Sequence, residues 1–416
     1  MPENAVVLGV GMTAWGKWGR PFVDYGVAAA RDALDDAGVD WADIDLIVGG
    51  ETVRNGYAGY VAGSTVAAAL GFNGAQVATV YGACASGAMA IDHGRAHIMA
   101  GLADVVLVVG ADTTPKGFLA PNAGERPDDP DWLRFRLLGA TNPAYFGLYA
   151  RRRMHLYGAT ESDFAKVKVK NSRHGVDNPR ARYRKEVAEE EVLASPIVAS
   201  PLHLLDICAT SDGAAAVVLC SADYAARQAG RAHDRTGGRP TVHIAAVSVV
   251  TPAFPDTGLG LPDLATDSSA PAGTPRTPGP VLPPRPPRSF RDSIAHTAYE
   301  QAGIGPEDVD VAEVYDLSTA LELDWYENLG LCAPGEAEQL IRRGATALGG
   351  AATTVNPSGG LACFGEAVPA QAIAQVCELV WQLRGDALGR QVEGARVGIS
   401  ANQGLFGHGS SVIVQR

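Results

Sequence analysis

The stretch TVYGACASGAMAI, from Thr79 to Ile91, decides how the chain folds. A short apolar strand pattern runs into Gly82, and Cys84 then stands directly before a helix start rich in Gly and Ala. A helix N-terminus carries partial positive charge and unpaired N–H groups, which favour an ionised thiol. Cys84 is therefore a candidate nucleophile. The alternative is that it is a small buried side chain, as most intracellular cysteines are.

Composition and charge narrow the class of protein. The chain has 416 residues, of which 46% are hydrophobic and 19% charged, and its net charge is −12. An acidic chain of this kind is not expected to bind nucleic acid or an anionic membrane surface. No apolar run approaches the roughly 20 residues that span a bilayer, and the start MPENAVVLGVG lacks the features of a signal peptide. The 6 cysteines form no CxxC pair, so we expect no metal site and no disulfides, as in a cytoplasmic enzyme.

Strand and helix patterns alternate through the first part of the chain. Continuous apolar runs predict strands at residues 5–11, 44–48 and 105–109, and helical spacing predicts helices at 25–37 and 61–70. Strands that are apolar on both faces and alternate with helices are typical of a parallel sheet covered by helices. The sequence therefore predicts an α/β fold with a parallel sheet.

Residues 113–200 are less regular. The stretch at 125–132 is rich in Pro and Asp, and helices are expected at 144–157 and 162–174. Basic side chains gather here: Arg151, Arg152, Arg153, Lys166, Lys168, Lys170, Arg173, Arg180, Arg182 and Arg184. In an acidic chain such a region can hold a phosphorylated ligand. The alternative is a solvated helix face with salt bridges.

An internal repeat divides the chain. The segment from Ala37 to Asp45 has its counterpart from Ala302 to Asp310, and Ala103-Asp104-Val105 is similar to Ala395-Arg396-Val397. The stretch 251–288 between the copies is rich in Pro, Gly, Ser and Thr, as linkers are. We therefore predict an N-terminal half at 1–250 that contains the loop region at about 113–200, a Pro-rich linker or insertion at 251–288, and a C-terminal half at 289–416. Two such halves place a site at a shared crevice.

Several motifs are spread over nearly the whole chain. They are GACASGAMAI at 82–91, SDGAAA at 211–216, NPSGGL at 356–361 and ELVWQLRG at 378–385. With the duplicated halves, these motifs resemble the thiolase superfamily. The segments GVGMT at 9–13, PLHLLDICATSDGAAA at 201–216 and VAEVYDLSTALELDWYENLGLC at 311–332 are similar to sterol-carrier-protein-X thiolases and actinobacterial lipid-transfer proteins. The resemblance implies the thiolase fold, a five-layered α-β-α-β-α sandwich of two duplicated halves.

Only one of the four thiolase catalytic positions is matched. Cys84 corresponds to the nucleophile, but Tyr315-Asp316-Leu317-Ser318 stands where thiolases have His-Asp-Cys-Phe, and Gly365-Glu366-Ala367 stands where they have Gly-His-Pro. The acid/base cysteine is missing from both of its possible positions, Asn402 and Leu317. Loss of an oxyanion donor costs about 10²–10³ in rate, so the thiolase reaction is expected to be impaired.

The replacements resemble those of actinobacterial steroid side-chain aldolases. These proteins carry Tyr-Asp and Gly-Glu-Ala at the same places and cleave a β-hydroxyacyl-CoA by a retro-aldol reaction. The resemblance implies catalytic roles for Tyr315, Glu366, His408 and Asp316, with Cys84 marking the site. The phenol of Tyr315 has a reference pKa near 10, which a cationic or hydrogen-bonded pocket would lower. We therefore expect Tyr315 to act as general base or acid, assisted by Glu366 or His408.

Two departures leave other functions open. The aldolases have a second tyrosine after Gly-Glu-Ala, where this chain has Val368-Pro369, and they lack the cysteine that Cys84 supplies here. One alternative is a Cys84-dependent thiolase or acyltransferase of lipid catabolism. Another is a non-catalytic subunit that binds acyl-CoA or a lipid.

The resemblance also suggests the ligand and the partners. The substrate is expected to be a coenzyme A thioester, with no permanently bound cofactor. Candidate ligand-binding residues are Ser358, Gly359 and Gly360 of the NPSGGL segment and Arg153 and Arg184 of the basic cluster. The expected assembly is a homodimer joined by a small zinc-ribbon and OB-fold partner, which gives a heterotetramer.

Overall fold

The structure is a computed structural model that describes residues 5–51, 62–114, 141–229, 239–252, 290–404 and 408–416. The predicted Pro-rich linker at 251–288 lies almost entirely outside the described residues, as does the loop expected at 125–132. The predicted boundaries of the three segments of the chain therefore stay predictions.

The elements fall into three groups. The N-terminal half comprises β1 (Val6–Met12), α1 (Phe22–Ala37), η1 (Trp41–Asp43), β2 (Leu46–Gly50), α2 (Ala62–Leu70), β3 (Gln76–Val80), α3 (Ser86–Met99), β4 (Val105–Thr113), β7 (Asp212–Cys220), α8 (Ala222–Ala229) and β8 (Val242–Val250). A lobe inserted between β4 and β7 comprises α5 (Asn142–Tyr157), α6 (Glu161–Val176), α7 (Glu189–Leu193), β5 (Ile197–Ala199), β6 (Leu202–His203) and η2 (Leu204–Asp206). The C-terminal half comprises α9 (Phe290–Ala302), η3 (Pro306–Asp308), β9 (Val311–Val314), α10 (Thr319–Asn328), α11 (Ala337–Arg342), β10 (Thr354–Val355), α12 (Gly360–Phe364), α13 (Gln371–Arg384), η4 (Leu388–Arg390), β11 (Val397–Gly404) and β12 (His408–Gln415).

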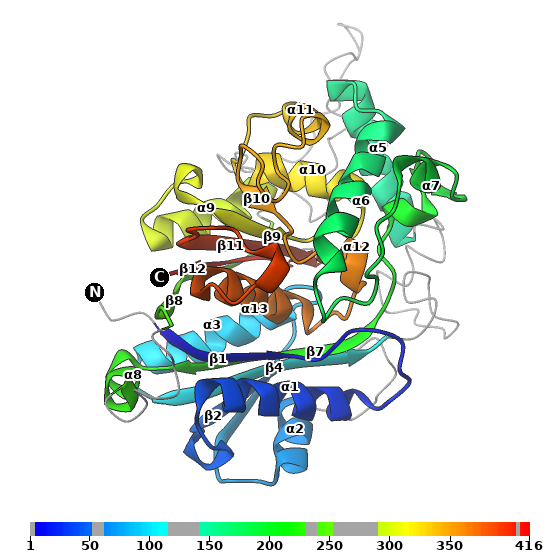
Figure 1. The fold of residues 1–416 in the computed structure, drawn as a ribbon. Coiled ribbons are helices and arrows are strands. Elements are labelled where there is room, and N and C mark those ends of the chain that lie inside the picture. Colours follow the sequence, from blue (N-terminus) through cyan, green and yellow to red (C-terminus); the bar gives the residue numbers. More distant parts are fainter. Residues whose placement is uncertain (1–4, 52–61, 115–140, 230–238, 253–289, 405–407) are drawn as a thin grey trace, which may run out of the picture.

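Five layers of helices and strands stack on one another (Figure 1). Helices α1 and α2 cover the outer face of β1, β7, β4, β2 and β3. Helices α3 and α13 form the middle layer and contact strands on both sides. The second layer of strands follows, and α9 packs on its outer face beside α10. This arrangement is the α-β-α-β-α sandwich that the motifs predict.

The prediction of a parallel sheet is only partly correct. The 10 strands are hydrogen-bonded in the order β10-β9-β11-β12-β8-β1-β7-β4-β2-β3. Parallel pairs join β2 to β3 and β4, and β9 to β10 and β11, whereas β1, β7, β8 and β12 pair in antiparallel fashion. A parallel connection needs a crossover of a dozen or more residues. The short link from Gly404 to His408 therefore forces β11 and β12 into a hairpin.

The repeat read from the sequence reappears as matching local structure. Helices α1 and α9 each end at a glycine with positive φ, Gly38 at 67° and Gly303 at 69°. In the first half, the Asp45 carboxylate accepts the N–H groups of Asp104 and Val105 at 2.8 and 2.9 Å. In the second half, Asp310 accepts those of residues 396 and 397 at 2.7 and 3.0 Å. The repeated sequence thus forms the same structure at the start of a strand in each half.

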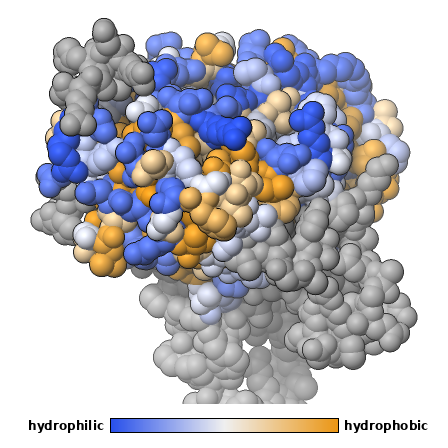
Figure 2. Space-filling view, turned by 90° about the horizontal axis from the view of Figure 1, so that it is seen from below, coloured by the Kyte–Doolittle hydropathy of each residue, from blue (hydrophilic) through white to orange (hydrophobic). Residues whose placement is uncertain are grey.

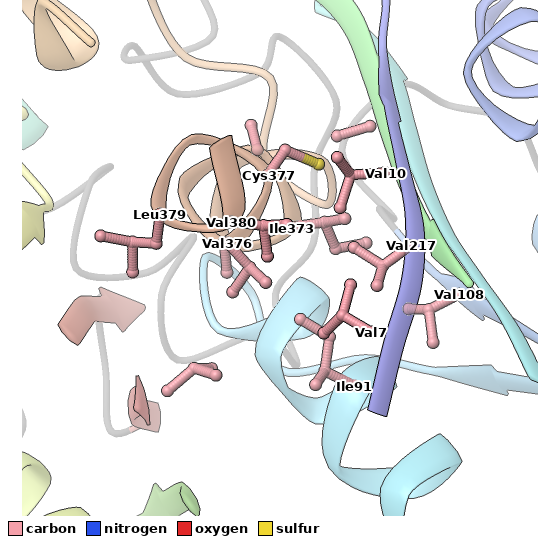
Figure 3. Close-up of a cluster of buried hydrophobic side chains, with 14 of the residues drawn as sticks. Val7, Val10, Ile91, Val108, Val217, Ile373, Val376, Cys377, Leu379 and Val380 are labelled. Atoms are coloured by element: carbon pink, nitrogen blue, oxygen red, sulfur yellow. The ribbon is translucent and has the colours of Figure 1, made fainter. Parts of the chain in front are cut away.

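Apolar side chains from the two halves meet around the middle layer (Figure 3). Ile373, Val376 and Val380 of α13 point toward β1 and α3, whose Val7 and Ile91 are fully or almost fully buried. Each buried aliphatic side chain stabilises the fold by about 1.5–3 kcal/mol relative to an exposed one. This core fixes the start of α3, which follows Cys84, against the start of α13.

Candidate active site

Cys84 lies in a strained turn between β3 and α3. Ala83, the residue before it, has a φ of 50°, which is unusual for a residue other than glycine and is often found at active sites. The hydroxyl of Ser86 holds the turn, because it accepts the N–H of Gly82 at 2.9 Å and donates to the carbonyl of Ala83 at 2.7 Å. The Cys84 side chain is 2% exposed. The turn therefore presents the thiol into the interior at the beginning of α3.

Tyr315 follows directly after β9, at the carboxyl end of the strand. Its backbone carbonyl accepts a hydrogen bond from Nε1 of Trp325 in α10, at 3.1 Å. The residue before it, Val314, donates its N–H to Oδ1 of Asn356 at 2.8 Å. Tyr315 itself is 2% exposed, so its phenol is directed into the protein.

Glu366 stands on a loop after α12 that the N-terminal half holds in place. Its backbone N–H donates to the carbonyl of Ala209 at 2.7 Å, and its carbonyl accepts from Ser211 at 2.8 Å. Gly365 has a φ of 74°, and a Cβ there would lie 2.4 Å from Oγ of Ser211, so only glycine fits. The pairing residues 209–211 come directly before β7. The two halves therefore build this part of the site together.

The three side chains form one buried cluster centred on the carboxylate. Sγ of Cys84 donates to Oε1 of Glu366 at 3.3 Å, and the phenol of Tyr315 donates to the same oxygen. Glu366 is 1% exposed. Sequence analysis selected all three residues from segments more than 50 positions apart, and the structure brings them together.

The surroundings of Tyr315 change the role expected for its phenol. Burial raises the pKa of Tyr315 well above its usual value, and the neighbouring acidic groups of Cys84 and Glu366 raise it further. The expectation that the pocket lowers this pKa is therefore wrong, because the neighbours are acidic and not cationic. A phenol in this position is a hydrogen-bond donor at neutral pH, and the carboxylate beside it is the acceptor.

Asp316 lies next to Tyr315 in sequence but its carboxylate faces another way. It accepts the N–H groups of Leu361 and Ala362 at 2.7 and 3.1 Å and an amide N–H of Asn171 at 3.1 Å. Burial and the nearby carboxylate of Glu322 raise its pKa to about 8, although the backbone donors oppose this. Asp316 thus fixes the start of α12, which leads into Glu366.

His408 begins β12 and lies beside the Cys84 turn. It pairs with Gly404 across the β11–β12 hairpin. A Cβ on Gly404 would lie 3.3 Å from the backbone N of Cys84, and a Cβ on Gly82 would lie 3.7 Å from Cδ2 of His408. His408 is half-buried, and its imidazole lies beside Gly82 of the Cys84 turn.

A buried carboxylate, that of Glu313, holds the NPSGGL segment in place. Ser358 donates its hydroxyl to Glu313 at 2.7 Å and its N–H to the same carboxylate at 3.0 Å. Gly359 and Gly360 have φ values of 98° and 59°, and a Cβ on Gly360 would lie 2.6 Å from Oδ2 of Asp316. All three residues are buried. Their contact with coenzyme A stays a prediction, whereas their role in shaping the loop before Glu366 is visible.

Arg153 is occupied by acidic groups of the same chain. Its side chain is 0% exposed and forms ion pairs with Asp324 at 2.7 Å, Glu327 at 2.6 Å and Glu338 at 2.7 Å. This position disagrees with a role in holding a coenzyme A phosphate, because no donor of the guanidinium faces solvent. Arg184 is exposed and donates to the carbonyl of Val176 at 3.1 Å, so it remains a candidate.

The rest of the basic cluster is largely paired as well. The ion pairs are Lys170–Glu322 at 2.9 Å, Lys166–Glu189 at 3.2 Å, Arg180–Asp32 at 3.3 Å and Arg173–Glu186 at 3.7 Å. The alternative given for the cluster, a helix face laced with salt bridges, describes these members better than a phosphate site does.

Some residues that build the site escaped the sequence analysis. Ser86 holds the Cys84 turn, and Asn171 bridges Asp316 and Glu322 at 3.1 and 2.6 Å. Cys208 is buried, donates its N–H to the carbonyl of Leu317 at 3.0 Å, and has a pKa raised by burial and by Glu366. The signal for Cys208 was its place two residues before the TSDGAAA segment. Nothing local marked Asn171, which lies on the helix of the basic cluster.

Comparison with known proteins identifies the family. The thiolase N-terminal domain model matches residues 5–223, and the thiolase C-terminal domain-like model matches residues 287–416. The chain belongs to the thiolase family. Thiolases act on thioesters of coenzyme A, which agrees with the predicted class of ligand. The resemblance read from the motifs and the predicted fold are thereby confirmed.

Three relatives illustrate the range of the family. Sterol carrier protein 2 of Oryctolagus cuniculus is 32% identical over 96% of this chain and 70% of its own length. Acetyl-CoA acetyltransferase of Methanothermobacter thermautotrophicus is 33% identical over 99% of this chain and 98% of its own. A solved structure described as an Ltp2-ChsH2(DUF35) aldolase superposes with a TM-score of 0.76 at 27% identity, over 100% of this chain and 98% of that chain.

Two features are absent from the described residues. None of their helices combines the length and the apolar composition of a membrane span. Within the same part of the chain, no group of three or more His, Cys, Asp or Glu side chains is placed to hold a metal ion. All six cysteines lie among the described residues, and each is a thiol.

Proposed function

We propose that the protein cleaves the Cα–Cβ bond of a β-hydroxyacyl-CoA by a retro-aldol reaction, releasing a ketone or aldehyde and a shorter acyl-CoA. The observation that carries the proposal is the buried carboxylate of Glu366, which accepts hydrogen bonds from both Tyr315 and Cys84. A carboxylate acceptor is suited to removing a proton from a hydroxyl group. The solved relative described as an aldolase supports this reaction class.

The reaction begins with the β-hydroxyl group of the substrate. Glu366 takes the hydroxyl proton, the O–H electron pair forms the new carbonyl bond, and the Cα–Cβ bond breaks. Its electrons form the enolate of the departing acyl-CoA, with negative charge on the thioester oxygen. A proton then returns to the α-carbon and regenerates the thioester carbonyl. Tyr315, kept as a phenol by its raised pKa, donates a hydrogen bond to orient Glu366 or the substrate oxygen.

A second candidate function rests on the contact between Cys84 and Glu366. The thiol donates to the carboxylate at 3.3 Å, so Glu366 can also act as the base that activates Cys84 as a nucleophile. An acyltransferase would transfer the acyl group to Sγ, with coenzyme A as leaving group, and then to an acceptor. The relative named acetyl-CoA acetyltransferase supports this reading. Against it, a thiolate and a carboxylate in such proximity repel each other, which disfavours the ionised thiol.

The variant Cys84→Ala separates the two functions, and two further variants test the roles of Glu366 and Tyr315. Incubation with a panel of β-hydroxyacyl-CoA and acyl-CoA esters, with mass detection of the carbonyl product, gives the activity. For the retro-aldol reaction we expect Glu366→Gln to lose about 10²-fold or more in rate, and Cys84→Ala to retain most of it. Tyr315→Phe should lose activity while its matched control Tyr299→Phe, also a buried tyrosine with a bonded hydroxyl, should not. Loss of all activity in Cys84→Ala would refute the retro-aldol scheme.

The same panel decides the substrate class. We propose an acyl chain derived from a sterol or steroid side chain, on the resemblance to steroid side-chain aldolases and the relative named sterol carrier protein 2. Steroid-linked β-hydroxyacyl-CoA esters should then be cleaved faster than straight-chain esters of similar length. Equal rates with both would contradict the steroid assignment. Coenzyme A esters that bind without any reaction would favour a non-catalytic binding subunit.

We propose a homodimer that pairs through the edge of the N-terminal sheet. Strand β3 is the last strand in the order, and Val77, Phe72 and Tyr81 on or beside it are 40%, 73% and 44% exposed. An exposed edge strand with apolar side chains is a template for pairing with another chain. Figure 2 views the molecule from the side of α1 and α2 and shows apolar side chains among hydrophilic ones on this face. Sedimentation as a monomer at micromolar concentration would contradict the dimer.

We further propose a small separate partner with a zinc ribbon and an OB-fold. The description of the solved aldolase names two components, which supports a subunit of this kind for the present chain as well. Two copies of each would form a heterotetramer in the cytoplasm, where the six thiols stay reduced. Full activity of the purified chain by itself would count against the partner.

A further inference from the structure

Ser211 of the SDGAAA segment binds the chain on both sides of Gly365. Its hydroxyl donates to the carbonyl of Phe364 at 2.5 Å, and its N–H donates to the carbonyl of Glu366 at 2.8 Å. The serine is 0% exposed. We call residues 365–369 the Glu366 loop. A single residue directly before β7 therefore fixes the backbone at the beginning of this loop.

Arg182 of the inserted lobe holds the Ser211 hydroxyl in this orientation. Nη1 of Arg182 donates to the carbonyl of Thr210 at 2.5 Å and to Oγ of Ser211 at 3.3 Å. A guanidinium can only donate, so Oγ accepts from Arg182 and keeps its own proton for the carbonyl at the end of α12. The next residue, Tyr183, donates its N–H to the carbonyl of Cys363 at 2.9 Å. The lobe thus holds both α12 and the residues that bind the Glu366 loop.

The other end of the Glu366 loop packs closely against the N-terminal half. A Cβ on Gly110 of β4 would lie 2.1 Å from the carbonyl oxygen of Pro369, and a Cβ on Gly87 of α3 would lie 2.9 Å from the same oxygen. The backbone of β4 therefore needs glycine at position 110 to approach the loop. Gly87 belongs to the first turn of α3, three residues after Cys84. Both ends of the loop are thus anchored on the half of the chain that carries Cys84.

A base that stands on a loop needs such anchors. A misplacement of about 1 Å can cost 10²-fold in rate, and loops hold side chains less precisely than helices and strands do. The carboxylate of Glu366 must meet Sγ of Cys84 at 3.3 Å and also the phenol of Tyr315. One of these partners belongs to each half of the chain. A small shift of the loop relative to either half would therefore break one of the two contacts.

We infer that Ser211 and Arg182 are positioning residues that set the place of the Glu366 carboxylate within the cluster. Ser211 acts through the backbone of the Glu366 loop, and Arg182 acts through Ser211. The inference rests on the proposed function, because proton transfer by Glu366 is the step that requires this placement. It gives the inserted lobe a part in placing the catalytic carboxylate.

Steady-state kinetics with a β-hydroxyacyl-CoA test the inference. Ser211→Ala and Arg182→Ala should each lower kcat at least tenfold and change KM less than twofold, because the substrate still binds while the base is displaced. Arg182→Lys keeps N–H donors and should recover at least a third of the wild-type kcat. Unchanged kcat in both alanine variants, or a raised KM with unchanged kcat, would overturn the inference.

Two control variants remove similar side chains from other contacts. Ser248→Ala removes a serine that is 1% exposed and whose hydroxyl donates to the carbonyl of Ile294 at 2.5 Å. Arg180→Ala removes an arginine from the same segment as Arg182, but its guanidinium pairs with Asp32 at 3.3 Å. Both controls should keep the wild-type kcat. A loss confined to the two positioning residues then reflects their contacts with the Glu366 loop.

The reactivity of Cys84 reports the place of the carboxylate without any cleavage. The negative charge of Glu366, 3.3 Å from the thiol, disfavours the thiolate that reacts with iodoacetamide. Alkylation of Cys84, read by mass measurement of its peptide, should therefore be at least threefold faster in Ser211→Ala and Arg182→Ala than in the wild type. Glu366→Gln should show the same increase. Cys377, which is 0% exposed in α13, should stay unreactive in every variant with an intact fold.

The outcomes separate this inference from the proposed function. Faster alkylation of Cys84 in both alanine variants of a protein that cleaves no β-hydroxyacyl-CoA would support the placement and reject the retro-aldol reaction. Cleavage at the wild-type rate in both variants, with unchanged alkylation, would reject the placement and leave the retro-aldol reaction standing. Lower kcat together with alkylation of Cys377 would assign the two residues a purely structural role. If Ser211→Ala folds poorly, Arg182→Ala and Arg182→Lys carry the test, because this arginine is only half-buried.

Discussion

Replacing Arg153 by methionine should destabilise the protein without weakening its affinity for coenzyme A esters. The guanidinium is 0% exposed and makes charged hydrogen bonds of 2.6–2.7 Å to three carboxylates, those of Asp324, Glu327 and Glu338. Methionine fills a similar volume but leaves the three acids without their cation. Removing one partner of a buried ion pair costs about 3–5 kcal/mol, and this position has three such pairs. We therefore expect the free energy of unfolding to fall by at least about 3 kcal/mol.

Denaturation in urea measures this loss of stability. The urea concentration at the midpoint of unfolding should fall, whereas the slope of the unfolding free energy against urea concentration should not change. The matched control is Arg184→Met, which removes an exposed arginine that makes one hydrogen bond to a backbone carbonyl. The control should change stability by less than about 0.5 kcal/mol. A stable Arg153→Met variant with a raised KM for coenzyme A esters would refute the reasoning and restore Arg153 as a phosphate ligand.

Three further predictions concern the turn, the pH dependence and the assembly. Ser86→Ala loses both hydrogen bonds of the Ser86 hydroxyl and leaves the buried N–H of Gly82 unpaired beside Cys84, so it should cost about 1–3 kcal/mol in urea denaturation and also lower kcat. Ser172→Ala, which loses the same two kinds of bond elsewhere, should lower stability alone. Burial and then Lys170 lower the pKa of His174 from 6.5 to about 3, so between these values the unfolded chain binds a proton that the folded chain does not. Stability should therefore fall as pH falls through this window, by about 1.4 kcal/mol per pH unit at most, and a flatter profile in His174→Gln would confirm the source. Val77→Lys on the edge strand should shift the dimer to monomer in sedimentation, whereas Leu388→Lys, at a more exposed apolar position elsewhere, should not.

Much of the fold could be predicted because its signals are local. The helices expected at 144–157 and 162–174 appear as α5 (Asn142–Tyr157) and α6 (Glu161–Val176), since apolar spacing and the capping box at Thr160 are written in neighbouring residues. Strand direction was not predictable in this way. The direction of a strand depends on the end of the sheet at which the chain re-enters after the lobe. The whole connection sets this end, and neighbouring residues do not.

The same difference between local signals and long-range contacts applies to the candidate site. The motifs identified Cys84, which keeps a motif residue, and Tyr315 and Glu366, which replace motif residues. The structure joins these three side chains through hydrogen bonds. The charge state of Tyr315 was not predictable, because it depends on which groups surround the phenol after folding. The burial of Arg153 among acidic groups was not predictable for a similar reason. Its three carboxylate partners lie more than 170 positions away in sequence, where no local pattern links them to it.

The central claim is that carbon–carbon cleavage proceeds through Glu366 and Tyr315 without a covalent thioester on Cys84. Rapid quenching of the wild-type protein during turnover of a β-hydroxyacyl-CoA, followed by intact-protein mass measurement, tests it most directly. The account predicts release of the carbonyl product from a protein of unchanged mass. An added acyl mass on the peptide that contains Cys84, absent in Cys84→Ala together with the activity, would contradict it.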